Sequence, residues 1–126
     1  MTGPLRWSIV IVDFDPVVGH EQMGERRTLV VSYEPFHASG RAAVCPISAR
    51  EPRYPGEVRI AAGHAGQTKD AVILCHQVRT IDLSRVRSFE ITGQMQHVTD
   101  PGIRREVRSA LSRHFGLDVP ASEDGA

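Results

Sequence analysis

The residues best suited to chemistry lie in one polar segment, residues 12–27, which separates two apolar runs. Imidazole and carboxylate groups can transfer protons, and guanidinium groups bind phosphate. The connection is longer than a tight hairpin turn needs, so we predict a functional loop held by a strand at each end. A solvated, charged loop without a function is the alternative. The candidate side chains of this segment are His20, Glu21, Gln22, Arg26 and Arg27.

Short β-branched and apolar runs predict the strands that position this loop. A proline within the third run, Pro46, indicates an edge, a bulge or a strand end. Short strands at close spacing predict a small antiparallel barrel or sandwich. The predicted strands cover residues 8–13, 28–33, 41–48, 57–61, 71–75 and 87–92, with 77–81 continuing or bending the fifth. Residues 34–40 and 83–86 are candidates for helical turns, and 62–70 for a flexible loop.

The C-terminal part of the chain has a helical pattern. Thr99 or Asp100 can cap a helix that has Pro101 at its first position, and Gly116 suits its end. Apolar residues then recur every four positions and predict one face packed on the sheet. These apolar residues are Ile103, Val107, Leu111 and Phe115. Residues 118–126 are acidic and predict a disordered tail after a single domain, residues 1–117.

The composition excludes several classes of protein. The formal net charge is +0, which argues against nucleic-acid binding through a bulk electrostatic field but allows a local basic groove. No apolar run approaches the roughly 18 residues of a membrane span, and no signal-peptide core is present, so we expect a cytoplasmic protein. Cys45 and Cys75 are expected to be buried thiols, because their spacing fits no zinc motif. We predict no metal and no cofactor.

Four motifs in order resemble the MazF/PemK family of bacterial toxins. The polar segment D-F-D-P-V-V-G-H-E-Q-M-G-E-R matches the family's loop, with Asp13, Pro16, Gly19 and Glu21 among the shared positions. The others are V-C-P-I-S at residues 44–48, Y-P-G-E-V at 54–58 and Q-V-R-T-I-D at 77–82. Each motif is weak alone, but their order and spacing agree from about residue 5 to residue 117. The resemblance implies a mostly β fold with a C-terminal α-helix, a small SH3-like antiparallel barrel of the MazF/PemK/CcdB type.

The resemblance also implies an activity. It is that of a type II toxin–antitoxin toxin, a metal-independent, sequence-specific endoribonuclease that cleaves single-stranded RNA and inhibits growth by cutting mRNA. Attack by the RNA's 2′-hydroxyl would leave a 2′,3′-cyclic phosphate and a 5′-hydroxyl. The implied partners are a second copy in a homodimer, a cognate MazE-like antitoxin, and RNA, with tRNA and rRNA as further substrates.

Two other functions stay open from the residues. The first is a non-catalytic relative that only binds nucleic acid, against which the joint presence of Arg26 and Ser48 argues. The second is a topoisomerase-poisoning toxin on the same fold. That group depends on a tryptophan near the C-terminus, whereas the single tryptophan of this chain is Trp7.

The resemblance assigns candidate catalytic residues. Arg26 would stabilise the phosphorane charge and is a candidate acid, and Ser48, at the family's threonine position, would keep a hydroxyl donor. His20 and His76 are alternative bases; His76 stands where the family usually has Asp or Glu. Arg27 replaces the family's usual proline, so it is open which of the two arginines faces the site.

The remaining candidates would bind RNA. Phe14 could stack on a base or be a core residue, and Glu21 and Gln22 could order the loop or bind a base edge. Two departures from the family, Trp7 for glycine and Met23 for a small residue, could change the loop's shape. The full set of candidate RNA-binding residues is Phe14, Glu21, Gln22, Arg27, Tyr54, Gln77 and Arg79.

Overall fold

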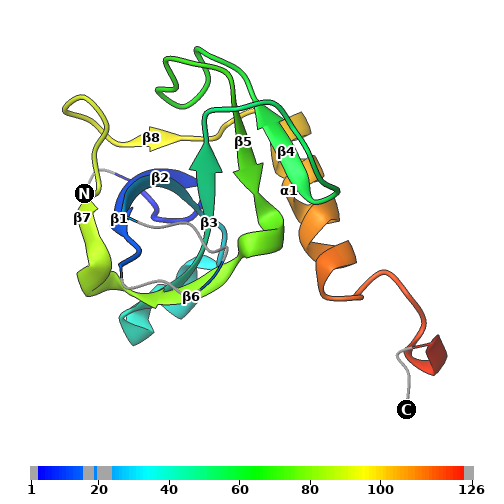
Figure 1. Cartoon of the computed structure of the whole chain (residues 1–126). Coiled ribbons are helices and arrows are strands. Elements are labelled where there is room, and N and C mark those ends of the chain that lie inside the picture. The colour runs from blue at the N-terminus through cyan, green and yellow to red at the C-terminus, as the bar shows by residue number, and fades with distance from the viewer. Residues whose placement is uncertain (1–2, 16–18, 20–23, 124–126) are drawn as a thin grey trace.

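The computed structural model describes residues 3–15, 19 and 24–123 (Figure 1), so His20, Glu21, Gln22 and Met23 lie outside the described residues. The strands are β1 Ser8–Asp13, β2 Glu25–Val30, β3 Arg41–Ser48, β4 Glu57–Ile60, β5 Ala71–Leu74, β6 Arg79–Asp82, β7 Val86–Ser88 and β8 Gln96–His97. The single α-helix within these ranges is α1, Pro101–His114. Short 3-10 helices are η1 Glu34–Ser39, η2 Cys75–Gln77, η3 Leu83–Arg85 and η4 Ala121–Glu123.

The strands form one antiparallel sheet that curls into a half-barrel. Its order is β4-β5-β3-β2-β1-β7, with β6 also pairing with β3 and β8 with β1. The helix α1 covers β4 and η2 on one side (Figure 1). The predicted fold class, mostly β with a C-terminal helix, is therefore confirmed. No helix of the described residues is long and apolar enough to cross a membrane.

Both faces of the central strands are buried, which explains their nearly continuous apolar sequence. Along β1, Ile9 belongs to a cluster that includes Val107 of α1, whereas the next residue, Val10, belongs to a second cluster on the opposite face. Along β2, Leu29 and Val30 alternate in the same way. We call these clusters the helix-side core and the inner core.

The helix begins as predicted. The carboxylate of Asp100 accepts a hydrogen bond from the Gly102 N–H at 2.7 Å and caps the helix, and Pro101 occupies its first turn. Its buried residues are Ile103, Val107 and Ala110. The predicted apolar face drifts, because a step of four residues rotates about 40° around a helix with 3.6 residues per turn. Phe115 is accordingly exposed.

The second strand is displaced from its predicted position, residues 28–33. It begins at Glu25, because β1 remains paired with it as far as Asp13, and it ends at Val30, where the chain bends toward η1. Arg26 and Arg27 therefore lie on a strand and not in the loop.

The region after β6 also differs from prediction. The strand predicted over residues 87–92 is wrong beyond Ser88, whose hydroxyl accepts from the Glu90 N–H and starts a turn. Positive φ values of 50° at Thr92 and 86° at Gly93 complete the reversal into β8, which the sequence did not indicate. The sequence left open whether residues 77–81 continue the fifth strand or bend it, and the structure has a bend there, formed by η2.

The segment predicted to be a flexible loop, residues 62–70, has a defined hydrogen-bonded shape. The Asp70 carboxylate accepts from the Ala62 N–H at 2.9 Å, and the Gly63 N–H donates to the Gln67 carbonyl at 2.8 Å. A lack of periodicity therefore did not mean a lack of structure. The tail, predicted to be disordered, contains η4 within its described part.

Candidate active site at the split of the sheet

The pairing of β2 with β3 ends inside both strands. The last pair is Thr28 with Pro46, after which β3 pairs with β5 through Ile47 and Ser48. Pro46 has no N–H to donate, which makes this a natural place for a strand to change partner. Since β2 stays with β1 as far as Glu25, the two strands part beyond Thr28 and Pro46. We call this parting the split.

Arg26 and Ser48 lie on either side of the split. Each stands two residues beyond the last pair, and side chains two apart on a strand point to the same face. Paired residues of antiparallel strands also share a face, so Arg26 and Ser48 lie on the inner-core side together. Both are partly buried, and the Thr28 hydroxyl donates to the Arg26 carbonyl at 3.0 Å. The structure thus brings the two leading catalytic candidates onto neighbouring strands.

Arg27 points to the opposite, helix-side face, which it shares with Leu29. Its Nη1 donates to the Gly66 carbonyl at 3.0 Å and to Gln67 Oε1 at 3.2 Å. The question left open by the sequence, which arginine shares a face with Ser48, is therefore answered by the strand register in favour of Arg26.

Carboxylates fasten both ends of the polar loop. Asp13 accepts from the Asp15 N–H at 3.0 Å and from Arg87 at 3.1 Å, and these two bonds, in that order, lower the pKa of Asp13. Asp15 in turn accepts from the Gly24 N–H at 3.0 Å, and Arg85 donates to the Asp15 carbonyl at 2.9 Å. No role was predicted for these residues from the sequence, in which the two aspartates before Gly19 were the available signal.

Glu57 organises the loop between β3 and β4. Its side chain is 0% exposed and receives two hydrogen bonds from Arg50, at 2.8 and 2.6 Å. The N–H groups of Arg53 and Tyr54 donate to the same carboxylate at 2.7 and 3.3 Å. The bonds from Arg50, above all, lower the pKa of Glu57 to about 2. This ion pair was missed, because nothing in the sequence links positions 50 and 57.

His76 lies beside this ion pair. Its Nε2 is 3.8 Å from Glu57 Oε2, and its ring centroid is 6.0 Å from that of Tyr54. Its Nδ1 is buried and has no hydrogen-bond partner among the described residues. His76 therefore lies between the β3–β4 loop, whose Tyr54 is exposed, and the helix α1, whose Ala110 and Arg113 line the same pocket.

The other RNA-binding candidates lie in different settings. Phe14 is 1% exposed within the inner core, and the Arg79 guanidinium lies 5.5 Å from its ring centroid. Gln77 is partly buried in η2. Across the part of the chain that the structure describes, no group of three His, Cys, Asp or Glu side chains could hold a metal ion.

Two proteins similar in sequence to this chain are named endoribonucleases. Endoribonuclease EndoA of Bacillus subtilis strain 168 is 33% identical over 98 residues, which cover 75% of this chain and 80% of that protein. Endoribonuclease toxin MazF of Escherichia coli K12 is 38% identical over 82 residues, 63% of this chain and 65% of that toxin.

Solved structures show the same fold. A MazF structure from Deinococcus radiodurans superposes with a TM-score of 0.69 at 28% identity, covering 88% of this chain and 94% of that one. MazF in a MazE–MazF structure from the same organism gives a TM-score of 0.66 at 26% identity, with coverage of 88% and 94%. Residues 5–115 match the family described as PemK-like, MazF-like toxin of type II toxin-antitoxin system. The chain belongs to this toxin family.

Proposed function

We propose that this toxin is a sequence-specific endoribonuclease that cleaves single-stranded RNA, mRNA above all, at the split of the sheet. The observation that carries the proposal is the placement of Arg26 and Ser48 on one face, each two residues beyond the last β2–β3 pair. A guanidinium and a hydroxyl in that arrangement can bind the same phosphodiester group. The relatives named as endoribonucleases support the same activity.

In the proposed reaction the RNA provides its own nucleophile. The 2′-oxygen attacks the adjacent phosphorus and loses its proton to a base, while the bond from phosphorus to the 5′-oxygen breaks and that oxygen gains a proton. Arg26 stabilises the negative charge that grows on the phosphoryl oxygens, and Ser48 donates a hydrogen bond to one of them. The products are a 2′,3′-cyclic phosphate and a 5′-hydroxyl, and no metal ion is required.

The base remains one of two histidines. His20 belongs to the polar loop and lies outside the described residues, whereas His76 lies beside Glu57. A neutral imidazole suits proton removal near neutral pH. The two assignments differ in which single variant, His20→Ala or His76→Ala, loses the base and cleaves slowly.

The toxin family and the MazE–MazF structures also support an antitoxin partner. We propose that a second copy of this chain completes a homodimer and that a MazE-like antitoxin inactivates it by covering the RNA-binding face. Because the proposed substrate is cellular RNA, the toxin would act in the cytoplasm.

The function is tested by incubating the protein with a mixed-sequence single-stranded RNA in excess EDTA. We expect cleavage at a restricted set of sequences, with 2′,3′-cyclic phosphate and 5′-hydroxyl ends. Activity that disappears on chelation and returns with magnesium would contradict the mechanism. RNA binding without cleavage, with or without a metal, would instead indicate a non-catalytic nucleic-acid-binding relative.

A further inference from the structure

We infer that Arg27 is a positioning residue that closes the sheet behind the split by tying β2 to the loop of residues 62–70. This inference rests on the proposed function, because the position that Arg27 controls is that of Arg26 relative to Ser48. We call the contacts of Arg27 with Gly66 and Gln67 the clasp.

The clasp is built from a buried acceptor and a backbone carbonyl. Arg27 Nη1 donates to both oxygens, at 3.0 and 3.2 Å, across about forty positions of sequence. Gln67 is buried, and its own N–H donates to the His64 carbonyl at 2.9 Å. A buried side-chain oxygen that loses its donor is costly, so the loop and the arginine stabilise each other.

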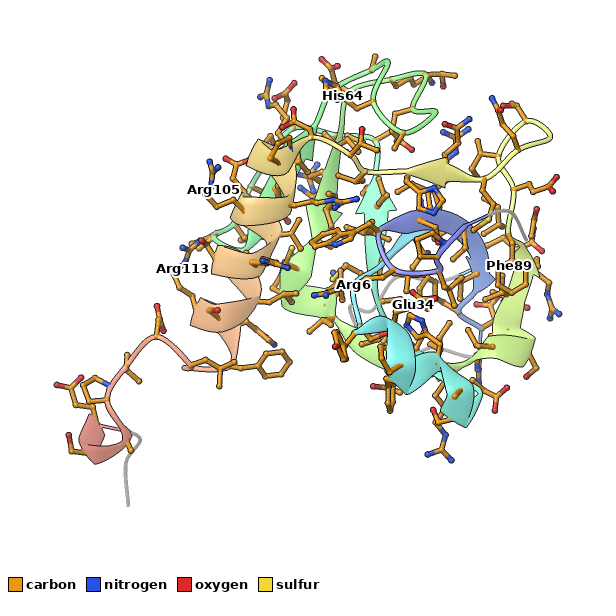
Figure 2. All side chains as sticks on the ribbon, turned by 180° about the vertical axis from the view of Figure 1, so that it is seen from behind. Arg6, Glu34, His64, Phe89, Arg105 and Arg113 are labelled. Atoms are coloured by element: carbon orange, nitrogen blue, oxygen red, sulfur yellow. The ribbon has the colours of Figure 1, made fainter. Side chains whose placement is uncertain are left out.

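The loop is also held from its other side. Gly66 has a φ of +74°, and a Cβ at this position would lie 2.8 Å from the Gln96 side chain of β8. The backbone of the loop therefore approaches β8 as closely as a glycine allows. The loop is therefore held to β2 by Arg27 and lies against β8 through Gly66, and both of these strands pair with β1. His64 marks this loop in Figure 2, at the end of the molecule where α1 begins.

The clasp spans the split. Arg27 is the next residue after Arg26 on β2, and the loop that it holds leads directly into β5. On β5, Val72 is the register partner of Ser48. Beyond Thr28 and Pro46 no β2–β3 pair continues among the described residues, so the clasp is a second connection between the strand of Arg26 and the strand pair of Ser48.

This connection controls the position of Arg26 relative to Ser48. A displacement of about 1 Å in a catalytic group can cost on the order of 100-fold in rate. Arg27 lies on the helix-side face of β2, so it does not reach the phosphate that Arg26 would bind on the inner-core side.

The test is a double-mutant cycle on Arg27→Ala and Gln67→Ala. The cleaved sequence is first located in mixed-sequence RNA, and a short RNA carrying it is then used at saturation. We expect Arg27→Ala to lower the single-turnover rate constant about 10- to 100-fold. Gln67→Ala should lower the same rate constant several-fold. The double variant should be no slower than Arg27→Ala, because the two substitutions remove the same clasp. Arg27→Lys, which keeps a donor, should recover part of the rate.

Binding is measured separately with the same RNA carrying a 2′-deoxy sugar at the cleaved position. If Arg27 only positions Arg26, the Kd of Arg27→Ala for this RNA should lie within about twofold of the parental value. If Arg27 binds RNA directly, the substitution should raise Kd and reduce the salt dependence of binding. Hydrogen exchange in residues 62–70 should rise in both single variants. The matched control is Arg108→Ala, which removes an exposed arginine from α1 and should leave rate, Kd and exchange unchanged.

The outcomes separate the two claims. A parent protein that cleaves no RNA would overturn the proposed function and the positioning role with it. A parent that cleaves, with Arg27→Ala at the parental rate or Gln67→Ala without effect on rate, would overturn the positioning role alone. Weaker binding of the 2′-deoxy RNA by Arg27→Ala at an unchanged rate constant would assign Arg27 to RNA binding.

Discussion

Glu57 provides the prediction whose size follows most directly from the structure. Its carboxylate is 0% exposed and is held by Arg50, which lowers its pKa from 4.5 to about 2. At about 1.4 kcal/mol per pKa unit, this difference amounts to roughly 3 kcal/mol of folding free energy. The stabilisation is fully present above pH 4.5 and is lost as pH falls through about 2, because the folded carboxylate resists protonation longer than the unfolded one.

The perturbation is Glu57→Gln, which keeps the side chain's shape and removes its charge. At pH 7 we expect the variant to be about 3 kcal/mol less stable, enough to lower Tm by roughly 10 °C in a domain of this size. At pH 3 the stabilisation that the ionised carboxylate gives the parent falls to roughly 1 kcal/mol. The difference in unfolding free energy between parent and variant should therefore narrow by about 2 kcal/mol.

Urea unfolding at pH 7 and at pH 3 measures both free energies of unfolding. The matched control is Glu51→Gln, which breaks an exposed ion pair with Arg59 and should cost less than about 1 kcal/mol at either pH. A gap between parent and Glu57→Gln that is the same at the two pH values would refute the reasoning, because it would show that Glu57 is not held ionised by Arg50.

Four further predictions concern other parts of the molecule. If His76 is the base, His76→Ala should cleave RNA slowly, whereas a rate comparable to that of the parent would leave His20 as the candidate. A hydrogen bond to Cys75, followed by burial, raises the pKa of the Cys45 thiol, so a water-soluble thiol reagent should label neither cysteine before unfolding, and rapid native labelling would contradict this. Trp7→Gly relieves the strain of a φ of 69° but removes a buried ring, and urea unfolding should show a net loss of about 2–4 kcal/mol, whereas a gain would contradict the packing account. Sedimentation at micromolar concentration should give twice the 13.9 kDa of one chain, and a fully active monomer would refute the dimer.

Local sequence signals predicted much of the fold. The cap at Asp100, Pro101 and the helical spacing identified α1, and β-branched runs located β1, β3, β4 and β5 with small errors at their ends. These signals succeed because capping, proline geometry and side-chain periodicity depend on neighbours in sequence. The short strand β8 carried no such signal, because two residues paired with β1 form only through the tertiary fold.

The candidate site was predictable in its residues but not in its geometry. Family motifs singled out Arg26 and Ser48, but only the strand register shows that they share a face while Arg27 does not. The Glu57–Arg50 ion pair could not be predicted, because its residues lie at the two ends of the β3–β4 connection and the path of that connection has no local signal. The contact of Arg27 with Gln67 could not be predicted either, because it joins segments about forty positions apart whose approach depends on how the sheet curls.

Cleavage at the split is tested most directly by the single-turnover rate constants of Arg26→Ala and Ser48→Ala on a saturating RNA in excess EDTA. Each variant should be slower than the parent by about two to four orders of magnitude, the range for losing a preorganised donor or an acid–base group. Both should unfold at nearly the parental urea concentration, since each residue is only partly buried. Because the two side chains act on one phosphodiester group, the double variant should be little slower than the slower single variant. A folded Arg26→Ala or Ser48→Ala protein that cleaves at the parental rate would contradict the assignment of the active site to the split.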